Sequence, residues 1–345
     1  MAQRFDADKL ELSGDPFPVA DQVGFDGVSF QTLASASDNG VLAYQSLGAG
    51  NTQLIWFDRG GKQLGVAGHP GDYSGLSLSP DDKRLAFQQV DSDTGNVDIW
   101  VTELTGDTSS RFTFDPVIEF GPVWSPDGSR IAFASLRTGF PNIFQKVSSG
   151  AGEDELLFSS PLATIPADWS RDGRFLVCQT VDLKTRWDLW ILSLSGERRW
   201  EIFLQTPSNE QRATFAPSGR WIAYESDESG KKEVYVRSFP ASGAKWQVSA
   251  GGGSQPRFTR DGKELFFLSA DRRMMAAQLQ TEGATFGFGA PRALFETHIS
   301  LKEDRPGNQY AVSSDGQRFL INSTIESTVT TPISVVVNWA AGVQK

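Results

Sequence analysis

The sequence predicts an all-β chain that folds as a β-propeller of seven four-stranded blades, with six or eight blades as the alternatives. Three observations support this: a strand–turn–strand motif that recurs along the chain, its near-constant spacing, and two further strand patterns behind each copy. No window combines a sustained helical period with helix caps. With 345 residues, of which 39% are hydrophobic, the chain can bury a sizeable core. We therefore expect one propeller domain over residues 1–345.

The recurring motif is a tight turn between two short strands, and its clearest copy is WSPDGSRIAF at 124–133. The other copies are LSPDDKRLAF (78–87), WSRDGRFLVC (169–178), FAPSGRWIAY (215–224), FTRDGKELFF (258–267), VSSDGQRFLI (312–321) and a shortened SDNGVLAY (37–44). Proline presets φ, aspartate bonds its own backbone, and glycine takes positive φ without a steric penalty. The turn-glycine position falls at 40, 82, 128, 173, 219, 262 and 316, a mean interval of 46 residues.

Two more strands follow each turn. The third-strand pattern is QLIWF (53–57), DIWV (98–101), NIFQ (142–145), DLWI (188–191), EVYV (233–236) and ISVV (333–336). The fourth is seen in SSRFTF (109–114), DELLF (154–158), WEIFL (200–204) and KWQVS (245–249). These runs are rich in β-branched and aromatic residues, as strands are. Four short strands in about 46 residues are typical of one propeller blade.

Residues 1–23 precede the first repeat and read as third and fourth strands of a blade. The last repeat supplies three strands, the third within 332–339, and has no evident fourth. We expect residues 16–20 to complete that blade, because closure of the ring removes sheet edges that would otherwise aggregate. Residues 1–6 are then a surplus strand, which suggests a chain that starts inside a blade, as a fragment, an excised domain or the product of an internal start.

Composition excludes several classes of function. The net charge of −10 does not suit a nucleic-acid or anionic-membrane partner, since both need a basic surface. The single cysteine, Cys178, allows no internal disulfide and no thiolate zinc site. His69 and His298 are the only histidines. No segment has the length of a membrane span, and the N-terminus lacks the apolar region of a signal peptide.

The sequence contains no catalytic or metal-binding motif that would identify an enzyme. It lacks the G-x-S-x-G elbow of serine hydrolases, and we interpret the two histidines as loop residues. Asp91 and Asp93 alternate as in a calcium loop, but the glycine at position six and the distal glutamate are missing, which favours a hairpin turn. We therefore expect no catalysis, no cofactor and no metal site, while weak calcium binding at Asp91 and Asp93 stays open.

A binding site is expected where equivalent loop positions differ between repeats, because variation on a constant frame can carry recognition. The loops that lead into each first strand vary between repeats in this way. They mix acids, arginine, amides and aromatic residues, which suits a protein or peptide partner. The candidate binding residues are Tyr73, Glu119, Phe120, Thr164, Glu210, Arg212, Gln255 and Asn308.

The W-S-P-D-G turn followed by D-I-W-V resembles the TolB-like, WD40-like propeller repeat of bacteria, over essentially the whole chain. A narrower resemblance covers residues 1–23, SDNGVLAYQS, NTQLIWFDRGGKQL and the ending PISVVVNWAAGVQK. These segments are similar to the C-terminal propeller of bacterial transmembrane Ser/Thr protein kinases, although no kinase motif is present. The resemblance implies an extracytoplasmic, monomeric, non-catalytic sensing or scaffolding domain.

Two other functions remain open. One is a free-standing TolB-like adaptor of the cell envelope that docks another protein. The other is a glycan or small-molecule enzyme with a carboxylate site at the channel mouth, formed by residues such as Glu119, Asp168 and Glu210. A membrane-anchored native chain favours the receptor, and an activity that one carboxylate change abolishes favours the enzyme.

Overall fold

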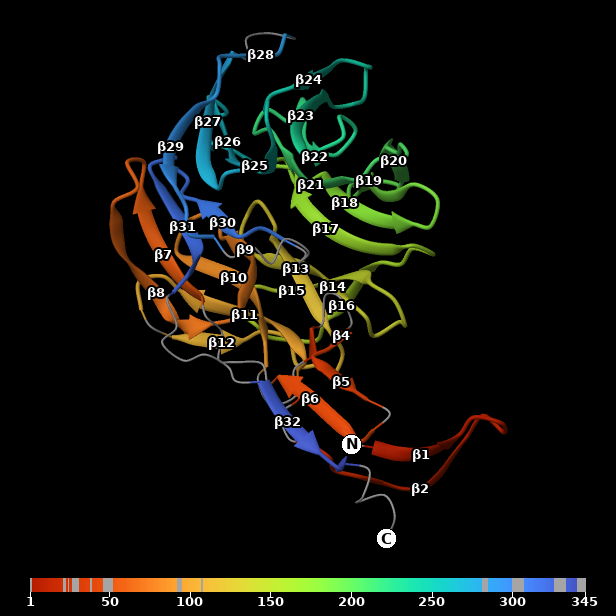
Figure 1. Cartoon of the computed structure of the whole chain (residues 1–345). Coiled ribbons are helices and arrows are strands. Elements are labelled where there is room, and N and C mark those ends of the chain that lie inside the picture. Colours follow the sequence, from red (N-terminus) through yellow and green to blue (C-terminus); the bar gives the residue numbers. More distant parts are fainter. Residues whose placement is uncertain are drawn as a thin grey trace.

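The computed structural model describes residues 2–20, 23, 25–26, 31–37, 39–45, 52–91, 95–106, 108–280, 285–299, 307–325 and 333–339. Every regular element longer than one residue in these ranges is a β-strand, which confirms the predicted all-β class. The described residues include no helix long and apolar enough to cross a membrane. Figure 1 shows most of the strands arranged in sheets around a central axis.

Among the described strands, the ring contains six antiparallel blades, five with four strands and one with five, numbered here from the first complete one. Blade 1 contains β9 (Tyr73–Leu78), β10 (Arg84–Val90), β11 (Val97–Glu103) and β12 (Ser109–Arg111). Blade 2 contains β13 (Glu119–Trp124), β14 (Arg130–Ser135), β15 (Asn142–Val147) and β16 (Glu155–Phe158). Blade 3 contains β17 (Ala163–Trp169), β18 (Phe175–Asp182), β19 (Arg186–Ser193) and β20 (Trp200–Leu204).

The second half of the ring follows the same plan. Blade 4 contains β21 (Glu210–Phe215), β22 (Trp221–Ser226), β23 (Glu233–Ser238) and β24 (Lys245–Gln247). Blade 5 contains β25 (Gly253–Phe258), β26 (Glu264–Ser269) and β27 (Arg273–Gln280), and two short strands share its outer edge: β28 (Gly287–Phe288) and β29 (Arg292–Glu296). Blade 6 contains β30 (Tyr310–Val312), β31 (Arg318–Thr324), β7 (Thr52–Asp58) and β8 (Gln63–Gly71).

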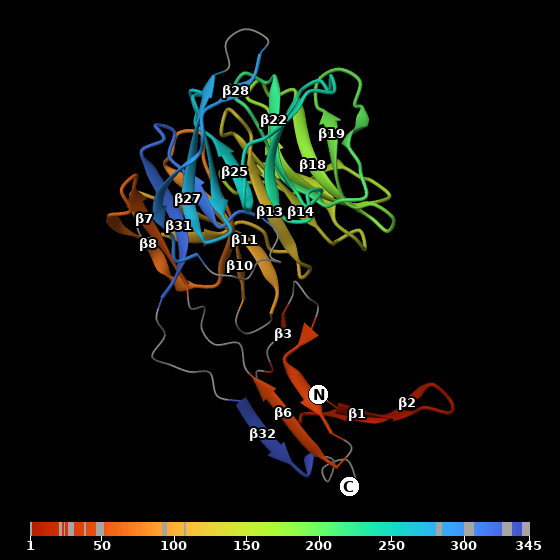
Figure 2. The same ribbon diagram turned by 45° about the horizontal axis from the view of Figure 1, so that its top comes forward.

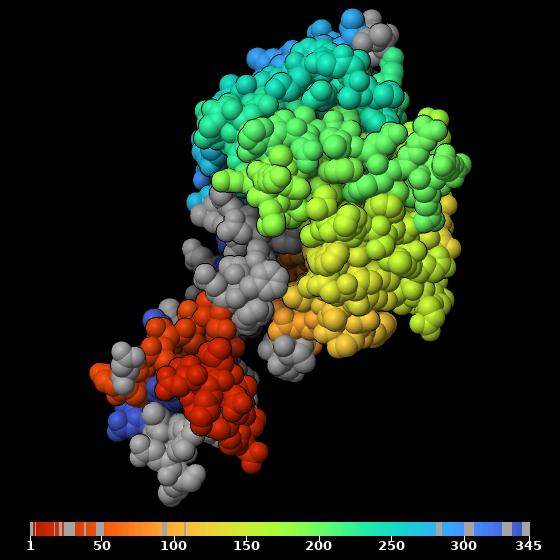
Figure 3. Space-filling view, turned by 90° about the vertical axis from the view of Figure 1, so that its right-hand side faces the viewer, coloured from red at the N-terminus to blue at the C-terminus, as the bar shows by residue number. Residues whose placement is uncertain are grey.

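The remaining strands form three small sheets from the two ends of the chain. They are the hairpin of β1 (Ala2–Asp6) and β2 (Glu11–Phe17), the pair β3 (Phe25–Asp26) and β4 (Gln31–Thr32), and a sheet of β5 (Ala34–Ala36), β6 (Val41–Gln45) and β32 (Ile333–Val337) in the order β32-β6-β5. Figure 2 shows β1, β2, β3, β6 and β32 projecting from one side of the ring, and Figure 3 shows the red N-terminal residues projecting likewise.

The ring differs from the prediction in the number of blades and in the strands that close it. N-terminal strands do complete the last blade, but they are β7 and β8, whereas residues 16 and 17 end β2, which pairs with β1. The turn at Gly40 and the third-strand pattern at 333–336 lie together in the separate sheet β32-β6-β5. Since β7 and β32 carry equivalent patterns, the sequence repeat does not decide which of them pairs with β31. The long β31–β7 ladder from Arg318 to Thr324 makes that choice.

The core of the ring is divided among the six junctions between neighbouring blades. Each junction has its own cluster of buried apolar side chains, and the cluster between blades 6 and 1 includes Leu54, Leu76, Phe87 and Leu320. The ring is therefore held by face-to-face packing of adjacent sheets, as expected for radially repeated sheets.

The predicted turns form as expected at the ends of the inner strands. In the turn at Gly128, the Ser125 hydroxyl donates to Asp127 Oδ1 at 2.6 Å and accepts from the Arg130 amide at 2.9 Å. The bond from Ser125, helped by bonds from Ser129, holds the pKa of Asp127 below its ordinary 3.8. Gly128 has φ of 71°, a conformation that glycine adopts without strain. The same serine-to-aspartate bond recurs at Ser79, Ser170 and Ser313.

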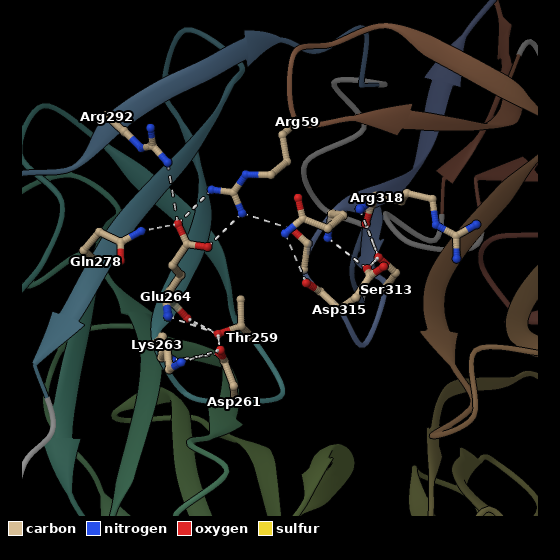
Figure 4. A network of polar contacts seen from close by, with 12 residues as sticks. Arg59, Thr259, Asp261, Lys263, Glu264, Gln278, Arg292, Ser313, Asp315 and Arg318 are labelled. Atoms are coloured by element: carbon tan, nitrogen blue, oxygen red, sulfur yellow. Dashed lines mark hydrogen bonds and ion pairs between the residues drawn. The ribbon is translucent and has the colours of Figure 1, made fainter.

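A charged contact reinforces the junction between blades 5 and 6. Arg59, which follows β7, donates from both terminal nitrogens to the Glu264 carboxylate at 2.7 and 2.8 Å, and also to the Gly316 carbonyl at 3.0 Å. Gln278 donates to the same carboxylate at 2.5 Å, and Arg292 lies 3.8 Å from it. Figure 4 shows these side chains converging on Glu264. The contact ties the N-terminal strands of blade 6 to blade 5.

Candidate binding channel

The six inner strands surround a cavity on the ring axis. It encloses about 190 Å³ and is lined by residues of β9, β13, β17, β21, β25 and β30. A second cavity of about 290 Å³ continues along the axis towards the S-P-D-G turns and shares lining residues such as Asp168 and Phe258 with the first. We call the two cavities together the axial channel.

We call the first cavity the upper cavity and the second the lower cavity. Three charged side chains face the upper cavity. Asp168 Oδ2 accepts from the Thr214 hydroxyl at 2.8 Å and from the Phe215 amide at 2.7 Å. Burial raises the pKa of Asp168, although the positive charge of Arg257 opposes that change. Arg212 binds Glu225 at 2.8 Å and donates to the Gly307 carbonyl at 3.2 Å. These contacts fix Asp168 and Arg212 in place.

Arg257 differs from these two because its guanidinium makes no hydrogen bond or ion pair with any other described residue. It lies on the upper cavity, where burial lowers its pKa and the charge of Asp168 partly restores it. A half-buried arginine whose donors are unused can donate hydrogen bonds to an anionic group.

Two more arginines lie at the turn end of the channel. Arg260 donates across the opening to the Pro80 carbonyl at 2.6 Å, and Arg171 donates to the Arg260 carbonyl at 3.1 Å. Both line the lower cavity. Together with Arg212 and Arg257 they give the channel four arginines in a chain of net charge −10.

The sequence prediction did not identify Arg171, Arg257 or Arg260. A signal for two of them was present: they occupy the second position of the turn motif, where three of the other ring copies have proline and the remaining one has Ser314. A basic residue that replaces the usual turn proline in two copies therefore marks the channel opening. Arg257 has no comparable signal in the sequence, because only the structure shows that this position of β25 lines the channel.

The predicted binding residues lie at the start of the inner strands, but they are buried and do not form one surface. Only Arg212 and Asn308 line the channel, and the other six lie in the junctions between blades: Tyr73, Glu119, Phe120, Thr164, Glu210 and Gln255. Tyr73 packs edge-on against Phe87, and Phe120 packs with Ile165. Thr164 donates to the Leu162 carbonyl at 2.8 Å.

Two of the predicted residues, Arg212 and Gln255, have a structural role that the sequence did not show. Each has positive φ, 49° and 55°, at a bulge of its inner strand. The Arg212 amide donates to Gln179 Oε1 at 3.1 Å, and the Gln255 amide donates to Glu225 Oε2 at 3.0 Å. Both acceptors belong to the preceding blade. These bonds link neighbouring blades next to the channel.

The three carboxylates of the enzyme hypothesis do not come together. Asp168 lies on the channel, while Glu119 and Glu210 are fully buried at two different blade junctions. Glu119 pairs with Arg137, which also binds Asp154 at 2.7 Å.

Other residues weighed for chemistry lie apart from the channel. His69 and His298 are exposed, and Cys178 is buried with a raised pKa. Asp93, predicted to alternate with Asp91 in a loop, lies outside the described residues. Within the described ranges, no three His, Cys, Asp or Glu side chains lie close enough to hold a metal ion.

Comparison with known proteins adds to this picture. The PD40 family, described as the TolB beta propeller domain, matches residues 32–184. The putative TolB from Agrobacterium tumefaciens superposes with a TM-score of 0.64 at 18% identity, over 81% of this chain and 100% of that one. The fold of this chain is therefore that of a TolB-like β-propeller. TolB from Acinetobacter baumannii superposes with a TM-score of 0.54 at 18% identity, over 75% of this chain and 66% of that one.

One sequence relative of this TolB-like propeller is the Tol-Pal system protein TolB from Desulfosudis oleivorans. It is 26% identical over 115 residues, which are 33% of this chain and 25% of the relative. The match thus spans about a quarter of the curated relative. The similarities to solved structures, at 18% identity, show the fold alone.

Proposed function

We propose that this TolB-like propeller binds a partner protein without catalysis of its own, and that an extended acidic segment of the partner occupies the axial channel. The observation that carries the proposal is the set of four arginines on the channel, of which Arg257 is unpaired within the described residues. In a chain with 42 acidic and 32 basic residues, this gathering of positive charge selects for anionic groups.

A binding role fits the channel better than a carboxylate enzyme does. Asp168 is the only one of the three proposed catalytic carboxylates on the channel, and one of its oxygens already accepts two protein hydrogen bonds. General acid–base chemistry with paired carboxylates needs a second group within reach of the same substrate. Glu119 and Glu210 are buried elsewhere and do not supply it.

The wider role follows from resemblance and is part of the same proposal. The similarity of several segments to kinase-linked propellers supports an extracytoplasmic sensing domain of a receptor kinase. The TolB relatives, named as Tol-Pal system proteins, support a free-standing envelope adaptor equally well. Fractionation of the native host separates them. A membrane-bound band much larger than 37.7 kDa supports the receptor, and a soluble band near that mass supports the adaptor.

The binding proposal is tested by selecting peptides from a random display library on the immobilised propeller. We expect enrichment of sequences rich in Asp and Glu, and loss of that enrichment on the Arg257→Gln variant. Arg257 makes no protein hydrogen bond within the described residues, so this variant should keep its fold, which its melting curve checks. Enrichment of neutral or basic sequences, or equal enrichment on both proteins, would show that the channel is not the site.

A further inference from the structure

Two buried carboxylates, Asp188 and Glu210, meet at the junction between blades 3 and 4. Both are 0% exposed. Asp188 of β19 lies opposite Thr180 of β18, and Glu210 is the first residue of β21, which packs against both strands. Burial raises the pKa of Glu210, and the negative charge of Asp188 raises it further. The structure thus places two acids near each other in the interior.

Each carboxylate has one oxygen that is satisfied and one that is not. Asp188 Oδ2 accepts from the Thr185 hydroxyl at 2.6 Å and from Gln205 at 2.9 Å, and Glu210 Oε1 accepts from the Thr206 hydroxyl at 2.5 Å. Asp188 Oδ1 and Glu210 Oε2 are buried and have no hydrogen-bond partner among the described residues. Neither acid forms an ion pair there with a lysine or arginine. Buried charges of this kind are normally paired or bind a metal.

A third oxygen at the same place is also unsatisfied. Thr180 is 0% exposed and stands directly opposite Asp188 in the β18–β19 ladder, yet its hydroxyl has no partner within the described structure. A hydroxyl can serve as a neutral oxygen ligand next to carboxylates. The buried Tyr224 hydroxyl is unpartnered within the described residues as well.

The repeat supplies an internal comparison at the junction between blades 1 and 2. There, Asp98 and Glu119 occupy the positions equivalent to Asp188 and Glu210, and each has an arginine partner. Arg111 binds Asp98 at 2.8 Å, and Arg137 pairs with Glu119. In blade 1, Arg111 lies opposite Trp100. At the equivalent position of blade 3, opposite Trp190, the residue is Ile202, which carries no charge.

The second arginine is also missing from blades 3 and 4. Arg137 follows its turn glycine, Gly128, by nine residues, and Glu228 follows Gly219 by nine. Glu228 forms an ion pair with Lys245 at 2.6 Å. The two cations that balance the acids in one junction are therefore replaced by an isoleucine and a third acid in the other.

We infer that the junction of blades 3 and 4 binds a hard divalent cation of the calcium type, with Asp188 Oδ1, Glu210 Oε2 and the Thr180 hydroxyl as protein ligands. All three donors are oxygens, which suits Ca²⁺, and two carboxylates balance its charge. The cation takes the place that the arginine side chains fill between blades 1 and 2. It lies away from the axial channel, so the inference is independent of the proposed function.

The test measures thermal unfolding of the purified propeller after chelation and then with added CaCl₂. At a Ca²⁺ concentration about 100 times Kd, binding should favour the folded state about 100-fold, which raises the melting temperature. Glu210→Gln and Asp188→Asn should lose this response. Glu119→Gln, at the equivalent arginine-paired position, should keep it.

A gain-of-charge variant separates a metal site from an ordinary buried acid. Glu228→Arg places a guanidinium where Arg137 lies in blade 2, so it should raise the melting temperature of the chelated protein and remove the calcium response. Tb³⁺ luminescence on the wild-type protein, displaced by Ca²⁺, gives a readout even if Glu210→Gln fails to fold. An unchanged melting temperature with Ca²⁺ and no Ca²⁺-displaceable Tb³⁺ signal would overturn the inference, as would an equal calcium response in Glu210→Gln.

Discussion

Replacing Leu54 by alanine tests which strand closes the ring. Leu54 is 1% exposed and lies on β7 within the cluster between blades 6 and 1, together with Leu76, Phe87 and Leu320. A buried leucine-to-alanine change costs about 2–5 kcal/mol, because it removes apolar contacts and leaves a cavity. At about 2 °C per kcal/mol for a domain of this size, the melting temperature should fall by about 4–10 °C.

The matched control is Val335→Ala in β32. Val335 carries the equivalent third-strand pattern but is 59% exposed in the sheet β32-β6-β5, outside the ring. A surface change of this kind stays within about 0.5 kcal/mol, so the melting temperature should move by about 1 °C at most. Both variants are compared with the wild type by calorimetry at one scan rate. A larger loss for Val335→Ala than for Leu54→Ala would place β32 in the ring and refute the six-blade closure.

Three further predictions follow from single contacts. Arg59→Ala removes the bidentate pair with Glu264 and should cost about 1–3 kcal/mol in urea unfolding, whereas an unchanged midpoint would show that this contact does not hold blade 6. Ser125→Ala removes the bond that lowers the pKa of Asp127, so the variant should melt below the wild type at pH 7. A carboxylate with a lowered pKa stabilises the fold above its unfolded pKa, and this stability is lost as pH falls through the folded pKa. The difference in melting temperature between variant and wild type should therefore shrink below about pH 3. Cys178 is buried with a raised pKa, so a thiol reagent at pH 8 should react only after unfolding, and rapid reaction of the native protein would contradict its place in the core.

The turns and strands were predictable because their signals are local. Each Ser-Pro-Asp-Gly segment contains its own hydrogen bonds, as Ser125 and Asp127 show, and alternating apolar residues mark the strands on either side. The closing blade was not predictable in the same way. It requires β31 to choose between β7 and β32, which carry similar patterns and lie more than 250 residues apart in the sequence. That choice depends on packing against blades 1 and 5, which the repeat does not encode.

The candidate site was predictable only in part. Of the eight positions predicted at the start of the inner strands, Arg212 and Asn308 line the channel. Glu119 and Glu210 point instead into blade junctions, because the first residue of an inner strand lies between two sheets. Whether such an acid is paired depends on residues in other strands, such as Arg137 for Glu119. Arg257 could be recognised only once the cavity was known.

The most direct test of the binding account is calorimetric titration of the strongest selected acidic peptide into three proteins: wild type, Arg257→Gln and Lys231→Gln. Lys231 is an exposed lysine in the loop between β22 and β23, so its change controls for general loss of positive charge. A charged hydrogen bond lost at Arg257 should weaken binding by about 10-fold or more, with little change for Lys231→Gln. Equal affinity of all three proteins for the peptide would contradict binding in the arginine-lined channel.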